Sequence, residues 1–350
     1  MVKFHTLHIM NSHITPHTLN SRDTYWDTVK AVLIFLVIFG HAIQFIVYQG
    51  VNHSNFWNDS LFKGIYIFHM PLFMLISGYF ATISFNRRKL ASIPRYLKRL
   101  ALPCIGFGLF QLFKKIWVGH PISPLLVYHH FTELWFLVVV FECFVFYVVY
   151  EHYGKNIVSK LILLILPIII ALIIPSLYPI SLLWPHTACF TFLWPFFITG
   201  SYIYKCNLIK HITNWRWGGC VIILYLICFF LFKETWYVYR TPMNFSLERI
   251  GINAFRYFSG LMGCLSFLFV IKMISNIIKS TFIQKIGQAT LAIYILQSFA
   301  IGRLRPYIQE CGYLEAVFIS LFILIALYYF YYITRRIPVF NLFAYGESNK

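Results

Sequence analysis

Long runs of apolar residues alternate with short polar connections along almost the whole chain. A run of about 20 apolar residues is long enough to cross a bilayer as a helix. By this criterion the pattern predicts ten spans, or nine if one of the two shortest, the seventh or the ninth, does not cross. The predicted spans are 29–49, 61–83, 100–118, 134–151, 157–175, 182–204, 218–233, 250–271, 286–302 and 313–333. The pattern therefore predicts an all-α fold, a polytopic membrane helical bundle.

Composition strengthens the membrane prediction. The chain is 59% hydrophobic and 11% charged, whereas soluble domains are about 45–50% apolar and about 25% charged. The formal net charge is +18, but in a membrane protein excess Lys and Arg marks the cytoplasmic loops beside anionic lipid. We therefore expect a multi-pass protein of the cell (inner or plasma) membrane, with the lipid bilayer as a partner and no nucleic acid.

Basic residues are distributed unevenly among the predicted loops, and this sets the orientation. The loops 50–60, 119–132 and 176–181 contain no Lys or Arg. Cations concentrate in the alternate loops, and such clusters mark the cytoplasmic side. The clusters are Arg87, Arg88, Lys89, Arg95, Lys98 and Arg99, then Lys155 and Lys160, Lys205, Lys210 and Arg216, Lys272, Lys279 and Lys285, and Arg335 and Arg336. With ten spans, both termini are therefore predicted to be cytoplasmic.

The segments outside the spans are short. Residues 1–21 lack the pattern of a cleavable signal peptide, and we predict a disordered cytoplasmic leader there. Metal binding by its histidines is the alternative, which their irregular spacing disfavours. The eight cysteines include no CxxC pair, so we expect neither a metal site nor a disulfide framework. We predict a transmembrane domain over 22–336 and a cytoplasmic tail over 337–350.

The first span carries a polar face. The eleven residues from Lys30 to His41 turn a helix by about 1100° and rise about 16 Å, so both side chains lie on one face. Asp27 lies about 40° away on the same helix. A titratable group in hydrocarbon is costly and usually faces a cavity or a partner. His41 is therefore the leading candidate for a functional residue.

Other polar side chains fall near the depth of His41. Counting about 1.5 Å per residue from the span ends brings four of them close to one level. They are His69, Glu142, Arg256 and Gln297. Each could instead serve packing, because a histidine can bond a carbonyl and Glu142 can pair with Arg256 across helices. Their common depth favours one polar cavity, and Pro71 and Pro103 interrupt their spans in a way tolerated beside cavities.

These residues are typical of acid–base chemistry. A histidine with a carboxylate in reach is the usual general base for activating a hydroxyl. The sequence contains neither a GxSxG nucleophile motif nor a GxxxxGK[ST] nucleotide loop. The candidate catalytic residues are His41, Asp27, Glu142 and His69. Among them His41 is the expected base.

A basic cluster at the cytoplasmic entrance indicates a phosphate-bearing donor, although the positive-inside bias alone would also explain it. Arg95 and Arg99 are four residues apart and share a helix face. Acyl-coenzyme A has phosphates at one end and a thioester on a long arm, which suits a basic mouth about 16 Å from a histidine. The candidate donor-binding residues are Lys30, Arg95, Lys98 and Arg99. We expect acyl-coenzyme A, typically acetyl-coenzyme A, as co-substrate and no permanently bound cofactor.

The motif Asp27-x-x-Lys30-(x10)-His41 resembles the Arg-x10-His signature on the first helix of the acyltransferase 3 family of integral membrane O-acyltransferases. Its context, KAVLIFLVIFGH, looks like the fucose 4-O-acetylase branch of that family. Further similar segments are FHMPLFMLISGYF (68–80), RYLKRLALP (95–103), ELWFL (133–137) and IGQATLAIYILQSF (286–299). Together they extend over most of the chain from residue 22 onward.

The resemblance implies a ten-helix enzyme that acylates, typically acetylates, hydroxyls of cell-surface carbohydrates from a cytoplasmic acyl-coenzyme A pool. The family histidine maps to His41, and the Arg-rich motif maps to Arg95 and Arg99. Lys30 stands at the motif arginine, where it keeps the charge but loses the bidentate geometry. Gln297 stands where some relatives have histidine, which disfavours it as a proton carrier.

Two other classes would use the same polar cavity. A transporter or flippase for a lipid-linked saccharide needs no bond chemistry, but the sequence shows no obvious inverted repeat. A polysaccharide polymerase would favour long external loops, and none is predicted. The separate membrane-bound O-acyltransferase family is a further alternative. The prediction that follows is a membrane O-acyltransferase with a cell-surface or lipid-linked carbohydrate as acceptor.

Overall fold

The computed structural model describes residues 24–49, 54–173, 186–240, 247–277, 280–308 and 311–347. The predicted leader, 1–21, and the predicted loop 176–181 lie outside these residues. Within them every regular element is a helix, which confirms the all-α class.

The helices follow the hydrophobic runs closely. In chain order they are α1 (Thr24–Ala42) with a π-helical turn η1 (Ile43–Val47), η2 (Ser54–Asn58), α2 (Ser60–Tyr66), α3 (His69–Arg88), η3 (Lys89–Ser92), α4 (Ile93–Trp117), α5 (Pro124–Thr132), α6 (Trp135–Tyr153), α7 (Ile157–Ile173), α8 (Thr187–Lys205), α9 (Ile209–Ile212), α10 (Trp215–Leu231), η6 (Glu234–Trp236), α11 (Leu247–Ile277), α12 (Thr281–Gln288), α13 (Thr290–Leu304), η7 (Arg305–Tyr307), α14 (Tyr313–Thr334) and α15 (Pro338–Tyr345). Each of the ten predicted spans overlaps at least one of them.

Polar caps explain where several helices begin. The Asp59 carboxylate accepts the Phe62 backbone N–H at 2.7 Å at the start of α2. Ser123 and Ser280 cap α5 and α12 in the same way. A side-chain oxygen at this position satisfies a backbone donor that has no partner inside the helix.

Five helical stretches among the described residues are long and apolar enough to cross a membrane. They are Thr24–Val47, Ser60–Trp117, Trp135–Tyr153, Arg249–Ser275 and Tyr313–Thr334, and the 58 residues of the second include α2, α3 and all of α4. Ile157–Ile173 and Trp215–Leu231 are shorter apolar helices. Apolar helices of a membrane protein are therefore present, whereas the count of ten and the cytoplasmic termini stay predictions.

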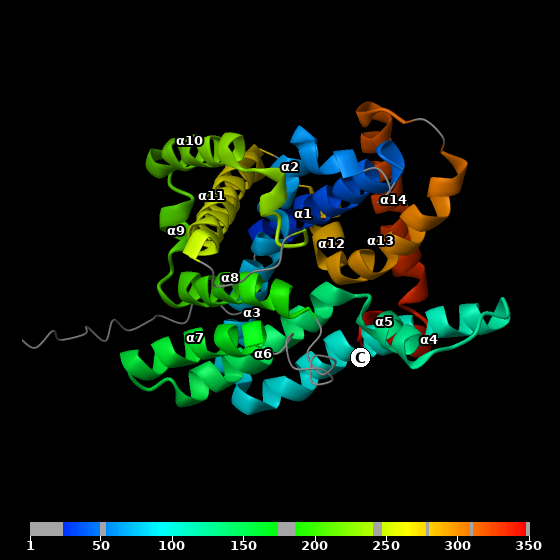
Figure 1. Ribbon diagram of the computed structural model, residues 1–350, viewed down its shortest axis with the longest axis horizontal. Coiled ribbons are helices and arrows are strands. Elements are labelled where there is room, and N and C mark those ends of the chain that lie inside the picture. The colour runs from blue at the N-terminus through cyan, green and yellow to red at the C-terminus, as the bar shows by residue number, and fades with distance from the viewer. Residues whose placement is uncertain are drawn as a thin grey trace, which may run out of the picture.

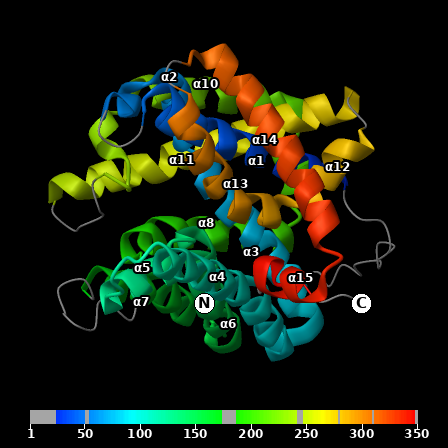
Figure 2. The same ribbon diagram turned by 90° about the vertical axis from the view of Figure 1, so that its right-hand side faces the viewer.

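The helices form two groups connected by α3. In Figure 1, α4 to α8 lie below, while α1, α2 and α10 to α14 lie above, and Figure 2 shows the same division from the side. Helices α3 and α8 cross at backbone distance. A Cβ added to Gly78 would come 1.9 Å from the Phe197 carbonyl oxygen, and one added to Gly200 would come 1.9 Å from that of Leu75. Small residues of this kind let membrane helices approach at backbone distance.

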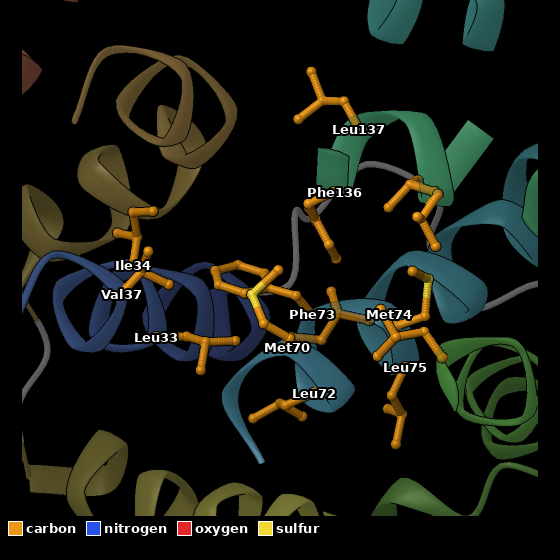
Figure 3. Close-up of a cluster of buried hydrophobic side chains, with 14 of the residues drawn as sticks. Leu33, Ile34, Val37, Met70, Leu72, Phe73, Met74, Leu75, Phe136 and Leu137 are labelled. Atoms are coloured by element: carbon orange, nitrogen blue, oxygen red, sulfur yellow. The ribbon is translucent and has the colours of Figure 1, made fainter. Parts of the chain in front are cut away.

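The core lies where α1, α3 and α6 meet (Figure 3). Leu33 from α1, Leu72 from α3 and Phe136 from α6 are among its buried side chains. Large apolar side chains also cover the outside of the bundle, such as Phe230 on α10 and Phe322 on α14, which are 76% and 68% exposed. An apolar exterior of this size suits a hydrocarbon environment and not water.

The segment after residue 336, predicted as a tail, contains a helix that packs on the bundle. Helix α15 lies against α4, beside which the red C-terminal end is drawn in Figure 2. A Cβ on Gly106 of α4 would lie 2.4 Å from the Phe343 carbonyl oxygen. Tyr345 is buried, and its hydroxyl lies 2.8 Å from that of Thr334 on α14. This contact holds α15 against the end of α14.

Candidate functional site

The polar residues of the bundle line two cavities. The histidine cavity has a volume of about 570 Å³, and its polar lining consists of His41, Gln44, His69, Glu133, Gln297, Ser298 and Arg305. The basic cavity has a volume of about 530 Å³, and its charged lining consists of Asp27, Lys30, Arg95 and Arg99. Both volumes are in the range of small-molecule binding sites.

His41 is held in a fixed orientation in the histidine cavity. Its ring Nδ1 lies 2.9 Å from Gln297 Oε1 on α13. An amide oxygen can only accept, so Nδ1 carries the proton and Nε2 keeps a free lone pair. The neighbouring Gly40 makes room for an aromatic ring, because a Cβ there would lie 2.7 Å from the Tyr66 side chain. The predicted base is therefore in the tautomer that leaves one ring nitrogen basic.

His69 owes its position to a break in the second predicted span. Helix α2 ends at Tyr66 and α3 begins at His69, two residues before Pro71. Proline fits the first turn of a helix, where its missing N–H has no partner to lose. The His69 Nδ1 donates to the Ile65 carbonyl at 3.0 Å, and its ring centroid lies 4.4 Å from that of Tyr66. The second histidine thus joins the first in one cavity, as the common depth predicted.

The basic cavity is built on the opposite end of α1. Lys30 Nζ lies 2.8 Å from Asp27 Oδ1, and the Gln288 amide donates to Asp27 Oδ2 at 3.2 Å. Helix α12 reaches this position because Gly287 has no side chain, since a Cβ there would lie 1.8 Å from the Asp27 carbonyl oxygen. Asp27 and His41 are fourteen residues apart, or about 21 Å along the helix. Asp27 therefore contacts the cation and not the imidazole.

The structure separates the other predicted cations into two groups. Arg95 and Arg99 line the basic cavity together with Lys30, whereas Lys98 does not. All three residues of the α4 cluster are exposed. Residues four apart lie on one face of a helix, which lets Arg95 and Arg99 line the same cavity. The arginine pair and Lys30 can together hold an anionic group such as a phosphate.

Two residues predicted at the common depth lie outside the histidine cavity. Glu142 and Arg256 line neither of the two cavities. Arg256 is buried and donates to Asn253 Oδ1 at 3.0 Å. The structure therefore brings His41, His69 and Gln297 together but does not add Glu142 to them.

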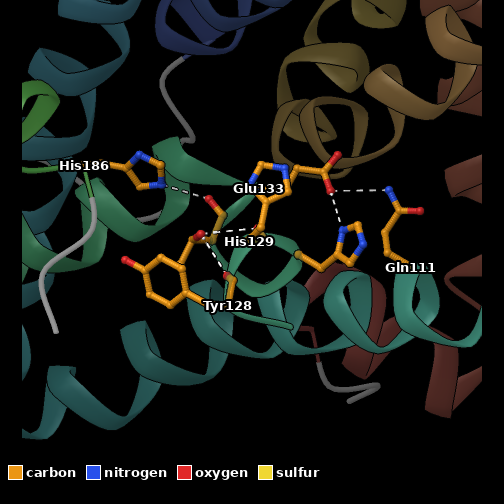
Figure 4. A network of polar contacts seen from close by, with 7 residues as sticks. Gln111, Tyr128, His129, Glu133 and His186 are labelled. Atoms are coloured by element: carbon orange, nitrogen blue, oxygen red, sulfur yellow. Dashed lines mark hydrogen bonds and ion pairs between the residues drawn. The ribbon is translucent and has the colours of Figure 1, made fainter. Parts of the chain in front are cut away.

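A different carboxylate lines the histidine cavity. Glu133, in the ELWFL segment between α5 and α6, accepts from Gln111 at 3.4 Å and from His130 Nδ1 at 3.3 Å (Figure 4). Sequence reasoning missed it because Glu133 lies just before the predicted span and belongs to no depth count. Arg305, also in the cavity lining, was missed for the same reason at the other end of α13.

His186 fixes the turn that carries Glu133. Its Nε2 donates to the Thr132 carbonyl at 2.9 Å, as Figure 4 shows. Burial lowers the pKa of His186 from its ordinary value of 6.5, more than the bond to Thr132 raises it. His186 precedes α8, so it connects the start of that helix to the turn between α5 and α6.

Aromatic side chains form the remaining walls of the histidine cavity. Trp57, Tyr66, Trp135 and Tyr239 all line it. A concave site with flat apolar walls and a few polar groups suits a ligand that has both apolar faces and hydroxyls. Within the described ranges, no group of three or more His, Cys, Asp or Glu side chains is arranged to hold a metal ion.

The structure thus contains two neighbouring cavities, one lined by two histidines and the other by Lys30, Arg95 and Arg99. The family model described as "Acyltransferase domain", that of the acyltransferase 3 family, matches residues 23–335. The chain therefore belongs to the acyltransferase 3 family, and its class is a membrane acyltransferase. The match does not test the narrower resemblance to the fucose 4-O-acetylase branch.

Two proteins with similar sequences have the same name. The chain is 28% identical over 312 residues to "Nodulation protein NolL" of Mesorhizobium japonicum, covering 84% of this chain and 80% of that protein. A shorter stretch of 63 residues is 54% identical to "Nodulation protein NolL" of Sinorhizobium fredii, covering 18% of this chain and 17% of that protein. No solved structure matches the chain.

Proposed function

We propose that this protein transfers an acyl group, typically acetyl, from acyl-coenzyme A to a hydroxyl of a cell-surface or lipid-linked carbohydrate. The observation that carries the proposal is the pair of cavities. One holds cations suited to the phosphates of the donor, and the other holds a histidine with a free Nε2 suited to a hydroxyl acceptor. Both reactants can therefore bind at once, in separate cavities.

The direction of the helices supports a ten-span topology with both termini in the cytoplasm. Helices α1 and α13 run from the basic cavity to the histidine cavity, since Lys30 and Thr290 line the first while His41 and Gln297 line the second. Helices α3 and α6 run the opposite way. In the ten-span order α1 and α13 are spans one and nine, and α3 and α6 are spans two and four. Odd and even spans thus have opposite directions, as strict alternation requires.

This topology puts the basic cavity on the cytoplasmic side of the cell membrane, where acyl-coenzyme A is available. The donor phosphates bind Lys30, Arg95 and Arg99, and Asp27 orients Lys30. The predicted Lys98 contributes charge near the entrance without lining the cavity. The acceptor enters the histidine cavity, whose aromatic walls and amide, carboxylate and guanidinium groups suit a saccharide.

The reaction needs one base and one electrophile. His41 Nε2 removes the proton of the acceptor hydroxyl as its oxygen attacks the thioester carbon. The tetrahedral intermediate collapses, the carbon–sulfur bond breaks, and the imidazolium returns the proton to the departing thiolate. Gln297 keeps Nδ1 protonated throughout. His69 lines the same cavity, where its ring can bond the acceptor.

Labelled acetyl transfer in membranes tests the proposal. Vesicles from cells that produce the protein, or His41→Ala, receive radiolabelled acetyl-coenzyme A, and label in the carbohydrate fraction is counted. We expect His41→Ala to lower transfer about 10³-fold, within the usual range for a general base. His152→Ala, which removes an exposed histidine at the end of α6, is the matched control.

Equal labelling by wild type and His41→Ala at equal membrane levels would contradict the base assignment. A transporter or flippase gives a different outcome. It would move a lipid-linked saccharide across the vesicle membrane without covalent label in the carbohydrate, and that result would overturn the transferase proposal.

A further inference from the structure

Tyr294 on α13 lies where the two cavities meet. Among the described residues it is the one side chain that lines both cavities. It precedes Gln297, the partner of His41, by three residues, which is slightly less than one helical turn and about 4.5 Å along the axis. Tyr294, Gln297 and Ser298 have helical spacing and share the cavity face of α13. The phenol is therefore between the predicted base and the predicted donor site.

The Tyr294 ring has a defined position. Its centroid lies 5.7 Å from that of Phe136 with an interplanar angle of 65°, and the Phe136 centroid lies 5.9 Å from that of Phe73. Figure 3 shows Phe136 and Phe73 close to each other between α6 and α3. These aromatic contacts hold the phenol ring at the junction of the two cavities.

We propose that the Tyr294 hydroxyl is a catalytic hydrogen-bond donor to the carbonyl oxygen of the acyl thioester. The proposal rests on the transferase function above. The thioester is joined to its phosphates by a long arm, so its carbonyl enters from the basic cavity, while the acceptor hydroxyl is activated in the histidine cavity. The carbonyl must therefore be at the junction when the two react, and Tyr294 is the hydroxyl-bearing side chain there.

The step balances without transfer of the phenol proton. As the acceptor oxygen bonds to the carbonyl carbon, the electron pair of the C=O bond moves to oxygen, and the acceptor proton passes to His41 Nε2. Tyr294 donates a hydrogen bond to the resulting oxyanion. The pair then returns to re-form C=O, the C–S bond breaks, and His41 protonates the thiolate. A preorganised donor aimed at developing charge is the usual means of stabilising such an intermediate.

Other hydroxyls of the two cavities are less suitable. Tyr66 and Tyr239 line only the histidine cavity, while Ser77 and Ser84 line only the basic cavity. Tyr66 also packs closely on Phe62, with ring centroids 3.7 Å apart. None of these four side chains borders both reactants.

Tyr294→Phe tests the proposal, because it removes the donor and keeps the ring that separates the cavities. We expect kcat for acetyl transfer to fall about 10²–10³-fold, the usual effect of losing one oxyanion donor, while the Kd for acetyl-coenzyme A is unchanged. The control is Tyr225→Phe, which removes a half-buried hydroxyl that donates to the Gly64 carbonyl at 2.5 Å and lines neither cavity. It should keep kcat within about twofold.

A second substitution keeps the result informative if Tyr294→Phe is unstable. Fluorinated tyrosines at position 294 retain the hydroxyl and make it a progressively stronger donor, so kcat should change in order of phenol acidity while thermal stability does not. A merely structural hydroxyl would give no such order. If the wild type transfers acetyl and Tyr294→Phe is equally active, the proposed role of Tyr294 is overturned and the transferase function stands. Absence of transfer in wild type overturns the transferase function and this proposal with it.

Discussion

The histidine cavity and the basic cavity have similar volumes, about 570 and 530 Å³, but different chemistry. The first contains two imidazoles, two amides, one carboxylate and one guanidinium among aromatic rings, whereas the charged groups of the second are three cations and one carboxylate. The same helices, α1, α3, α6 and α13, supply both. Because a helix 20 residues long spans about 30 Å, its two ends can carry different groups to different sides of a membrane. One set of helices therefore forms two chemically different cavities.

Removing the arginines of the basic cavity should give the largest difference between an effect on donor binding and an effect on kcat. Arg95→Ala combined with Arg99→Ala should weaken acetyl-coenzyme A binding about 100-fold, since each charge-assisted contact contributes about 1.5–3 kcal/mol before solvent screening reduces it. The kcat at saturating donor should change little, because the base is in the other cavity. Equilibrium binding of labelled donor and steady-state kinetics measure the two quantities.

Two variants sharpen that result. Lys98→Ala should cause a smaller loss of binding, because this side chain is outside the cavity lining. Lys155→Ala combined with Lys210→Ala removes the same number of exposed charges elsewhere and should leave donor binding unchanged. Equal losses in all these variants would mean that net charge, and not the cavity, attracts the donor.

Gly287→Ala tests how the basic cavity is built. The added Cβ would lie 1.8 Å from the Asp27 carbonyl oxygen, so α12 must move away from α1, at a cost of about 1–3 kcal/mol. We expect a lower thermal unfolding temperature in detergent. Gly219→Ala, where no atom lies within 4 Å of the new Cβ, should be neutral. A Gly287→Ala protein as stable as wild type would show that this approach is not required.

Gln297→Leu removes an amide from the histidine cavity, and Gln288→Leu removes one from the basic cavity. Their effects on kcat and KM can be compared. Gln297 bonds the His41 ring, so its loss should lower kcat about tenfold, equivalent to about 1.4 kcal/mol. Gln288 bonds Asp27, so its loss should raise the KM for the donor and leave kcat nearly unchanged. Identical kinetic effects of the two substitutions would contradict the separation of roles.

His186, the residue before α8, gives the smallest expected effect, a dependence of stability on pH. Its pKa is lowered in the folded protein, so folding favours the neutral ring. The stabilisation is complete above the ordinary value of 6.5 and is lost as the pH falls below it. The unfolding temperature of wild type should therefore fall more between pH 7 and pH 5 than that of His186→Asn.

The control for this measurement is His152→Asn, at an exposed position. It should keep the wild-type slope. His129 is the titratable neighbour of His186, and His129→Asn separates its contribution. Parallel curves for wild type and His186→Asn would show that this ring does not couple folding to pH.

Much of the fold was predictable because apolar runs report helices directly. The ten predicted ranges each overlap a helix, and the break beside Pro71 follows from the lost N–H of proline. Helical spacing also predicted that Lys30 and His41 share a face. It could not predict that this face opens into two cavities, since that depends on Tyr294 and Phe136, which come from other helices.

The depth count found His41, His69 and Gln297 but also included Glu142 and Arg256, which line neither cavity. A depth count gives the position of a side chain along the membrane normal. It does not give the direction in which the side chain points around its helix axis. Glu133 was missed because it lies in a connection and not in a span. Its position depends on the bond from the Gln111 amide and on the bond from His186 to Thr132, which are tertiary contacts.

The sequence by itself determined the class of this protein, its helices and the residues capable of chemistry, because hydrophobicity and helical periodicity are local properties. It also carried the family motif from Asp27 to His41. Only the tertiary structure decided which of these residues meet. Gly287 lets α12 touch α1, Gln297 selects the tautomer of His41, and Tyr294 borders both cavities. Contacts between helices depend on backbone approach and side-chain direction, which no single segment specifies.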